Sequence, residues 1–372
     1  VAREYCDIYY RVSTLDVEAI RNVAAAERVD CILTVCTDQA LLTVARVSEE
    51  LGLPCYLDYQ TALNVTNKQY MKQVFAAHGI PTARFLVLDE FEPEKLRGFR
   101  YPLIVKPVDC NSSKGVKKAL CEEELRGFFY EAKALSRTHT AIVEEFIEGP
   151  ELTADVYVQD GKAILLSCSR SDKIRDNDKF VIFRTVNPAG KELAGRVTAV
   201  AQQIADAFGL RNTPMLIQLL TDGENVYVIE FSARTGGGVK YLLIREVSGF
   251  DVIGAVVDLT EGKRPEVALR PPAHTYLVNE FIYCRPGVFE RLEGFDELKS
   301  AGVIADYYLF KWKGAEFDTV ANSGDRIAGF TLTGDTPEEI REKHRKANAG
   351  FRVIGTDGED LARHDLLTEP EL

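Results

Sequence analysis

Apolar and polar positions alternate in blocks along the first part of the chain. Helical spacing and short apolar runs follow one another at 16–29, 31–36, 39–51 and 52–57. The first and third blocks predict helices and the second and fourth predict strands. A further helix is expected over 66–80, with Thr66 or Asn67 as its cap and Gly79 at its end. This rhythm is typical of a parallel α/β sheet, so the expected fold class is α/β.

The middle of the chain is predicted to be rich in strands. They are expected at 84–89, 102–107, 141–147, 151–158 and 163–169. A helix at 122–135 lies between two of them, so residues 82–150 are expected to form a small lid-like unit. The longest helix pattern, 191–210, precedes a hairpin at 215–231 that turns at Asp222 and Gly223.

Prolines at 265, 271 and 272 mark a linker, after which apolar runs at 274–284 and 326–334 predict strands of a small α+β module. Its last helix is expected to start at Asp335 or Thr336, with Pro337 in the first turn. The chain is therefore expected to divide into domains 1–65, 66–264 and 265–372.

Charge and cysteine usage narrow the function classes. A formal net charge of -12 argues against general binding to nucleic acid or to an anionic membrane, so any phosphate site is local. The eight cysteines form no CxxC pair, which indicates reduced thiols in a cytoplasmic protein. Val1 opens on a charged segment without an initiator Met, so we expect an upstream piece to be missing and the first domain to be truncated.

The predicted hairpin carries the clearest candidate metal ligands. If its turn centres on Glu224, antiparallel pairing places Gln218 opposite Glu230. The same register places Leu220 opposite Val228. A carbonyl oxygen beside a carboxylate suits Mg²⁺, which prefers hard oxygen ligands. A Gln and a Glu on a solvated sheet face remain the open alternative.

The stretch VEEFIEGPE, residues 143–151, carries three candidate glutamates. Alternation sends Glu144 and Glu145 to opposite faces, so one of them is placed to meet a ligand. An acceptor at such a strand end can take the amino group of adenine, and Glu151 can take ribose hydroxyls. Solvated surface glutamates are the alternative interpretation.

Lysines form a second candidate group. Lys106 ends the apolar run at 102–107, Lys68 begins a predicted helix, and Lys114 and Lys179 lie in loops. A lysine is a suitable point-charge partner for phosphate, although each one alone also fits a surface charge.

The order of these pieces is more informative than any one of them. The chain carries in turn TNKQYMKQVFAAHGIPTARF, YPLIVKPVDCNSSKGV, AIVEEFIEGPELTADVYV and LIQLLTDGENVYVIEFSAR. Over roughly residues 5–265 this series resembles the ATP-grasp superfamily. It looks closest to the branch with carbamoyl-phosphate synthetase large chains, biotin carboxylases and L-amino-acid ligases. The resemblance implies an ATP-grasp fold preceded by a Rossmann-like domain over 1–65 and followed by the α+β module.

The resemblance also implies roles for individual residues. ATP is expected to contact Lys68, Lys106, Ser112, Ser113, Gly115, Val116, Glu144, Glu145, Phe146, Ile147 and Glu151. Mg²⁺, with Mn²⁺ as an alternative, is expected to bind Gln218, Glu230 and Ser232. The expected catalytic residues are Arg234, which steadies the phosphoryl group, and Lys179.

Two further implications concern the substrate and a departure from the family pattern. Arg175, Lys179, Lys240 and Arg245 are candidates for gripping a substrate carboxylate, or are ordinary surface cations. Many relatives have Asn where this chain has Ser232, whose shorter reach weakens the expected hold on a second Mg²⁺.

The implied reaction is an ATP-dependent, ADP-forming ligation of a small carboxylate, such as an amino acid, to an amine through an acyl phosphate. The expected partners are those small molecules, without nucleic acid or membrane, and a homodimer is favoured by the resemblance without being fixed by it. Two alternatives stay open: a carbamoyl-phosphate-synthetase-like or carboxylase-like enzyme that phosphorylates bicarbonate, and a module that binds ATP without turnover.

Overall fold

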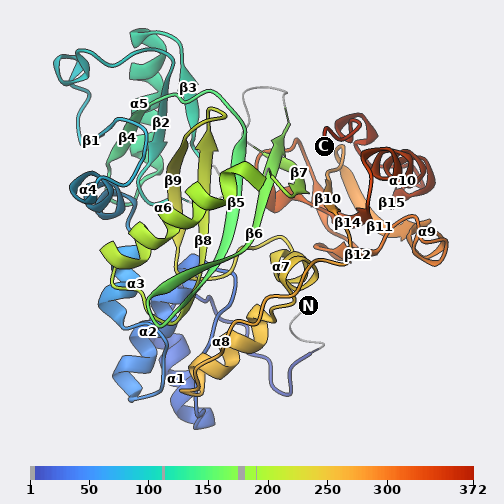
Figure 1. Ribbon diagram of the computed structural model, residues 1–372, viewed down its shortest axis with the longest axis horizontal. Helices are drawn as coiled ribbons and strands as arrows, with labels where there is room; N and C mark the ends of the chain where they lie inside the picture. The colour runs from blue at the N-terminus through green and yellow to red at the C-terminus, as the bar shows by residue number, and fades with distance from the viewer. Residues whose placement is uncertain (1–4, 111–113, 175–180, 190) are drawn as a thin grey trace.

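The structure is a computed structural model that describes residues 5–110, 114–174, 181–189 and 191–372. Figure 1 shows a group of N-terminal helices in blue, a small sheet with one helix in teal, a long central sheet, and an orange to red C-terminal part beside it. Among the described residues, no helix is long and apolar enough to cross a lipid bilayer.

The N-terminal region is helical. Its helices are α1 (Val17–Glu27), α2 (Asp38–Leu51), α3 (Tyr59–Thr66) and α4 (Lys68–His78). The strands predicted at 31–36 and 52–57 are wrong, because both segments lie in loops. An apolar run becomes a strand only where a neighbour pairs with its backbone, and no described strand lies beside either segment. The predicted helix cap at Asn67 and the helix end at Gly79 are confirmed.

A small four-stranded sheet, which we call the lid sheet, occupies residues 85–145. It contains β1 (Phe85–Leu88), β2 (Leu103–Pro107), β3 (Lys117–Ala119) and β4 (Ala141–Glu145) in the order β1-β4-β2-β3, with η2 (Pro93–Leu96) and α5 (Glu122–Leu135). Leu103 and Val105 pack in one core with Phe129 of α5. Because side chains alternate along a strand, Ile104 and Lys106 lie on the opposite face.

An eight-stranded sheet, the main sheet, forms the body of the protein in the order β12-β14-β10-β7-β6-β5-β8-β9. Its central strands are β5 (Glu151–Gln159), β6 (Lys162–Lys173), β7 (Ile182–Asn187), β8 (Thr213–Thr221) and β9 (Val226–Ser232). The helices that cover it are α6 (Ala194–Ala207), after η3 (Lys191–Leu193), and α7 (Lys240–Ser248) with α8 (Val252–Thr260).

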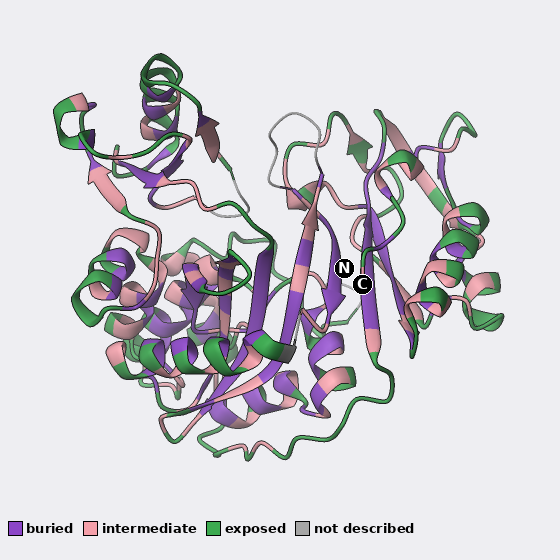
Figure 2. Ribbon diagram, turned by 45° about the horizontal axis from the view of Figure 1, so that its top comes forward, coloured by how far each residue is buried: buried purple, intermediate pink, exposed green. Residues whose placement is uncertain are grey.

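Alternation along β5 shows how the main sheet is covered on both faces. Leu152, Ala154 and Val156 belong to the core that α6 contributes to. Tyr157, which points the other way, packs with the core formed by α7 and α8. Figure 2 shows these strands as mostly buried, between helices whose outer sides are exposed.

The β8–β9 hairpin pairs Gln218 with Glu230, as predicted. The predicted facing of Leu220 and Val228 is wrong, because Leu220 pairs with Tyr227. The turn is centred half a residue earlier than assumed, and a bulge between Gln218 and Leu219 restores the Gln218–Glu230 pair.

The C-terminal part shares the main sheet. Its strands β10 (Tyr276–Ile282), β12 (Asp306–Leu309) and β14 (Ala328–Gly334) extend that sheet, and β10 pairs with β7 from Leu277–Asn187 to Glu280–Arg184. A second layer contains β11 (Gly287–Glu293), β13 (Glu316–Phe317), β15 (Arg352–Gly355), α9 (Phe295–Ser300), η4 (Ser323–Asp325), α10 (Pro337–Gly350) and η5 (His364–Leu366). Domain limits near residues 65 and 265 stay a proposal. The main sheet contains strands from both sides of residue 265, because β10 pairs with β7.

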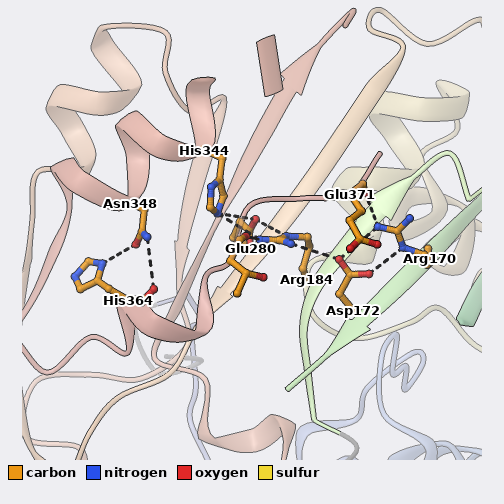
Figure 3. A network of polar contacts seen from close by, with 9 residues as sticks. Arg170, Asp172, Arg184, Glu280, His344, Asn348, His364 and Glu371 are labelled. Atoms are coloured by element: carbon orange, nitrogen blue, oxygen red, sulfur yellow. Dashed lines mark hydrogen bonds and ion pairs between the residues drawn. The ribbon is translucent and has the colours of Figure 1, made fainter. Parts of the chain in front are cut away.

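A buried polar network fastens the β7–β10 junction (Figure 3). The Arg184 guanidinium donates to Glu280 Oε1 at 2.6 Å and lies 3.3 Å from His344 Nε2. It also reaches Asp172 at 3.4 Å and the backbone carbonyl of Thr368. One side chain therefore connects β6, β7, β10, α10 and the C-terminal segment.

Candidate functional site

A cleft of about 670 Å³ lies between the lid sheet and the main sheet. That volume is in the usual range for a small-molecule site, roughly 300 to 1,000 Å³. The structure brings many of the predicted site residues to its walls. They are Lys68, Lys106, Val116, Glu144, Glu145, Phe146, Ile147, Glu151, Gln218, Glu230 and Arg234.

Lys106 reaches the cleft because alternation in β2 turns it away from the α5 core. Its ammonium lies 2.8 Å from Glu144 Oε2, and Lys72 lies 2.7 Å from Glu144 Oε1. All three side chains are buried. Burial alone would raise the pKa of Glu144, but the two lysines outweigh it and hold that pKa at about 2.

This arrangement changes the interpretation of Glu144. Its carboxylate binds two ammonium groups and so positions Lys106 at the cleft wall. Burial lowers the pKa of Lys72, and the neighbouring Lys106 adds to the lowering against the attraction of Glu144. Lys72 also donates to Thr82 Oγ1 at 2.6 Å, which fixes it to the hairpin through the Val228 carbonyl.

The hairpin residues meet a second lysine. Lys68, the first residue of α4, lies 3.0 Å from Glu230 Oε2 and donates to the Cys110 carbonyl at 2.5 Å. Burial would lower the pKa of Lys68, but Glu230 raises it above the ordinary value. Gln218 donates to Glu151 Oε1 at 3.3 Å, and Glu151 Oε2 lies 2.5 Å from Lys173.

An aspartate of the N-terminal region fixes the predicted catalytic arginine. Arg234 Nε donates to Asp38 Oδ1 at 2.7 Å and Nη2 to Asp38 Oδ2 at 2.5 Å, a two-point contact. Ser232 also donates to Asp38. Burial acts to raise the pKa of Asp38, yet Arg234 and Ser232 bring it below the ordinary value. Asp38 is the first residue of α2, so a residue far away in sequence completes this wall.

Backbone and apolar groups of the segment after β4 form another wall. Phe146 and Ile147 line the cleft, and the Lys118 ammonium lies 4.0 Å from the centre of the Phe146 ring. The Glu145 carboxylate accepts from the Arg100 backbone N–H at 3.2 Å. This wall offers a flat apolar surface beside charged groups.

Several predicted residues are placed elsewhere. Ser112, Ser113 and Lys179 lie outside the described residues. Gly115 does not line the cleft: its φ is +75°, and a Cβ there would lie 2.7 Å from Leu135 Cδ1, so the glycine meets a packing need. Arg245 is exposed on α7 and Lys240 is buried at the cleft wall.

The oxygen donors of the hairpin fit a magnesium ion. Gln218 and Glu230 are cross-strand neighbours, and Ser232 lies two residues further along β9. Glu230 is partly exposed, and its carboxylate contacts the Lys68 ammonium, a cation that a metal ion can replace. Among residues 5–110, 114–174, 181–189 and 191–372, no cluster of three or more Asp, Glu, His or Cys forms an all-protein metal cage. This donor set therefore suits a metal that takes part of its coordination from phosphate oxygens.

Sequence reasoning missed Lys72, Asp38 and Lys173 at the cleft. Lys72 had a usable signal, because it follows Lys68 by four residues and so lies on the same helix face. Asp38 at a helix start had no signal for its contact with Arg234, which depends on how the N-terminal helices pack against β9.

Comparison with known proteins gives two family matches. The profile of the ATP-grasp domain matches residues 99–241, and that of L-amino acid ligase C-terminal domain 2 matches residues 280–354. The phosphoribosylamine–glycine ligase of Streptomyces coelicolor is 27% identical over 94% of this chain and 86% of its own length. The carbamoyl phosphate synthase large chain of Clostridium acetobutylicum is 21% identical over 87% of this chain, which spans only 30% of that relative.

Solved structures agree in fold. An L-amino acid ligase from Bacillus licheniformis superposes with a TM-score of 0.76 at 22% identity, covering 91% of this chain and 84% of the other. The biotin carboxylase domain of the Hydrogenobacter thermophilus 2-oxoglutarate carboxylase, in complex with MgADP and bicarbonate, gives 0.76 at 17% identity, covering 98% and 89%.

Two sheets enclosing a lysine-lined cleft, together with the match over residues 99–241, define the class: the chain contains an ATP-grasp domain. Residues 280–354 match a domain of L-amino acid ligases, and the chain as a whole is similar to L-amino acid ligases and to phosphoribosylamine–glycine ligases. The predicted ATP-grasp fold with its C-terminal module is confirmed.

Proposed function

We propose that this protein joins a small carboxylate, such as an amino acid, to an amine, with ATP cleaved to ADP and phosphate through an acyl phosphate. The observation that carries the proposal is the convergence of Lys68, Lys106 and Arg234 on a cleft that also holds the Gln218–Glu230 pair. Cations and hard oxygen donors around one space suit a nucleotide triphosphate with its metal ion. We also propose that the protein forms a homodimer and that Mn²⁺ can replace Mg²⁺.

Each wall of the cleft has a role in this proposal. Phe146 and Ile147 contact the adenine ring, and backbone groups of 145–147 meet its polar edge. Glu151 binds the ribose, while Lys68, Lys106 and Val116 meet the phosphates. Ser112 and Ser113, which lie outside the described residues, are proposed for the same role. Glu144 acts on the nucleotide through Lys106, because its two oxygens already bind ammonium groups.

Gln218, Glu230 and Ser232 hold the magnesium ion in this proposal. When bound, the ion neutralises phosphate charge and aligns the oxygens of the transferring group. For Glu230 to bind it, Lys68 moves off the carboxylate and its ammonium becomes available to a phosphate oxygen. Ser232 is held by Asp38, so its hydroxyl oxygen keeps its place beside the metal ligands.

The chemistry then needs positioning more than proton transfer. A carboxylate oxygen attacks the γ-phosphorus, the bond to the β-phosphate oxygen breaks, and ADP leaves. The amine nitrogen attacks the acyl carbon, loses a proton, and phosphate departs with the attacking oxygen. Arg234, fixed at two points by Asp38, stabilises the charge that develops on the transferring group. We also propose Lys179, which lies outside the described residues, as a further catalytic cation.

The test is ADP release from Mg-ATP against amino acids, other small carboxylates and bicarbonate, each with and without an amine. Release that requires both a carboxylate and an amine is the expected result. Glu230→Gln should lower kcat by about 100-fold or more, since it removes a charged metal ligand. Glu224→Gln, in the exposed turn of the same hairpin, is the matched control and should leave kcat unchanged.

The acyl phosphate is tested with a carboxylate labelled with ¹⁸O. One labelled oxygen should appear in the phosphate released, because the attacking oxygen leaves with phosphorus. ADP release that needs bicarbonate alone, or unlabelled phosphate from a productive reaction, would contradict the proposal.

A further inference from the structure

Lys240 is a buried cation without a hydrogen bond. Its side chain is 8% exposed and lines the cleft at the start of α7. The nearest carboxylate is Asp155, with Oδ2 at 3.6 Å from Nζ, too far for a hydrogen bond, and no described partner accepts from Nζ. Asp155 is not a cleft-lining residue, so it balances the ammonium from within the protein.

Arg326 reaches the same cleft from the C-terminal part of the chain. Its guanidinium carbon lies 3.7 Å from the centre of the Phe281 ring. Nε donates to the Tyr283 hydroxyl at 3.1 Å and Nη2 donates to the Ile182 carbonyl at 3.0 Å. These acceptors are neutral, and no carboxylate of the described residues forms an ion pair with Arg326. The guanidinium is thus fixed in position by neutral groups, without a carboxylate partner in the part of the chain that the structure describes.

Both cations lie close to a run of three glycines, Gly236 to Gly238. A Cβ at Gly236 would lie 3.0 Å from Lys240 Cγ, and one at Gly238 would lie 2.9 Å from Arg326 Nη1. The φ of Gly238 is also +66°, which L side chains rarely adopt. Lys240 and Arg326 therefore both contact the backbone of the segment that follows the predicted catalytic Arg234.

Four other cations of the cleft contrast with this pair. Lys68, Lys106, Lys173 and Arg234 each lie within 3.0 Å of a carboxylate oxygen. Burying a positive charge without a close partner is unfavourable, and a bound anion removes that cost. Both side chains line the same cleft, and a guanidinium fixed in position, together with an ammonium, suits a planar or tetrahedral oxyanion.

We propose that Lys240 and Arg326 form a specificity subsite for a second anionic group of the substrate, a carboxylate or a phosphate that does not itself react. This inference rests on the proposed function and narrows its substrate class to acidic molecules. An uncharged analogue leaves Arg326 without a carboxylate partner among the described residues and Lys240 with only Asp155 at 3.6 Å, so the subsite discriminates against it.

The experiment compares acids with their uncharged counterparts by titration calorimetry on the full chain, with Mg²⁺ and a non-hydrolysable ATP analogue. The pairs are L-glutamate with L-glutamine, which tests a carboxylate, and O-phospho-L-serine with L-serine, which tests a phosphate. In at least one pair the acid should bind tenfold tighter or more. Where turnover is measurable, the same ratio should appear in KM rather than in kcat.

Variants assign the preference to the two cations. In Arg326→Gln and in Lys240→Gln the acid-to-neutral ratio should fall to within about threefold of one, while Arg326→Lys should keep part of it. Arg285→Gln, at an exposed arginine of the same C-terminal part, is the matched control and should keep the wild-type ratio. Thermal unfolding of each variant shows whether it is folded.

Three outcomes would overturn the inference: neutral ligands that bind as tightly as both acids, no binding of either acid at millimolar concentration, or a preference that survives in both variants. Equal weakening of acid and neutral ligand in Arg326→Gln would assign Arg326 a structural role only. None of these results would affect ADP release that depends on a carboxylate and an amine, so failure of the subsite is distinguishable from failure of the ligase.

Discussion

Replacing Glu144 with glutamine should destabilise the lid sheet strongly. The substitution leaves Lys72 and Lys106 buried side by side without the carboxylate that binds both. The pKa of Glu144 falls from an ordinary 4.5 to about 2 in the folded protein. At about 1.4 kcal/mol per unit, the charged form is favoured by about 3 kcal/mol, which agrees with the roughly 3 to 5 kcal/mol cost of breaking a buried pair.

The pH dependence has a definite sign. A carboxyl group whose folded pKa is depressed adds stability above its unfolded pKa and loses it as pH falls toward the folded value. The contribution of Glu144 is therefore complete at pH 7 and declines between about pH 4.5 and pH 2. At pH 4 the gap between wild type and Glu144→Gln should already be narrower by about 1 kcal/mol.

Hydrogen exchange followed by mass spectrometry measures this locally. The free energy of opening at β2 and β4 amides should fall by about 3 kcal/mol at pH 7 in Glu144→Gln. Glu145→Gln is the matched control, because its carboxylate lies 3.8 Å from Arg84 and 3.6 Å from the largely exposed Arg100. That change should cost less than about 1 kcal/mol.

Equal effects of the two substitutions would refute the reasoning, since they would mean that the buried lysines do not need the Glu144 charge. A drop that is as large at pH 4 as at pH 7 would also refute it. Lys72→Met should cost less than Glu144→Gln, because Glu144 keeps its contact with Lys106.

Two further predictions concern titration and metal binding. Burial raises the pKa of Glu280 to about 7 against the pull of Arg184, and burial followed by Arg184 lowers the pKa of His344 to about 4. Glu280 should make stability fall as pH rises, and His344 should make it rise. Between about pH 4.5 and 6.5 the melting temperature of Glu280→Gln should therefore increase with pH, and that of His344→Asn should decrease. Calorimetry that finds identical slopes in both variants would contradict this. Lys68→Met should tighten the binding of Mn²⁺ to the nucleotide-free protein by up to about tenfold, because the ammonium 3.0 Å from Glu230 competes with the metal. Electron spin resonance titration measures this, with Lys117→Met, which removes an exposed ion pair, as the control. Weaker or unchanged binding relative to that control would count against the prediction.

The sequence predicted the local features of this fold well where one element decided them. The hairpin and the helix bounded by Asn67 and Gly79 follow from pattern and turn chemistry, whereas the Gln218–Glu230 pair also depends on a bulge that the pattern did not predict. The prediction failed where strand pairing decided the outcome. The apolar run at 31–36 has the composition of a strand, yet no described strand pairs with it.

The candidate site shows the same division. The order of motifs along the chain indicated which lysines and acidic residues face the cleft. It did not indicate that Glu144 binds Lys72 and Lys106, or that Asp38 binds Arg234, because those contacts depend on packing between separate elements. Sequence order indicated part of the cleft lining, whereas Lys72, Asp38 and Lys173, and the ion pairs among the lining residues, follow from the assembled structure.

The pairing of β10 with β7 has a consequence for dividing this protein into fragments. A cut in the proline-containing segment near residue 265 looks harmless in sequence, yet it would strip β7 of its neighbour from Asn187 to Arg184. The shortened protein would present an unpaired strand edge, together with a buried arginine that has lost Glu280, and such edges recruit other chains. Fragments ending there should therefore self-associate, and Arg326 would be lost from the cleft with the removed part. The ATP-grasp portion and the C-terminal portion are best handled, evolved and engineered as one piece.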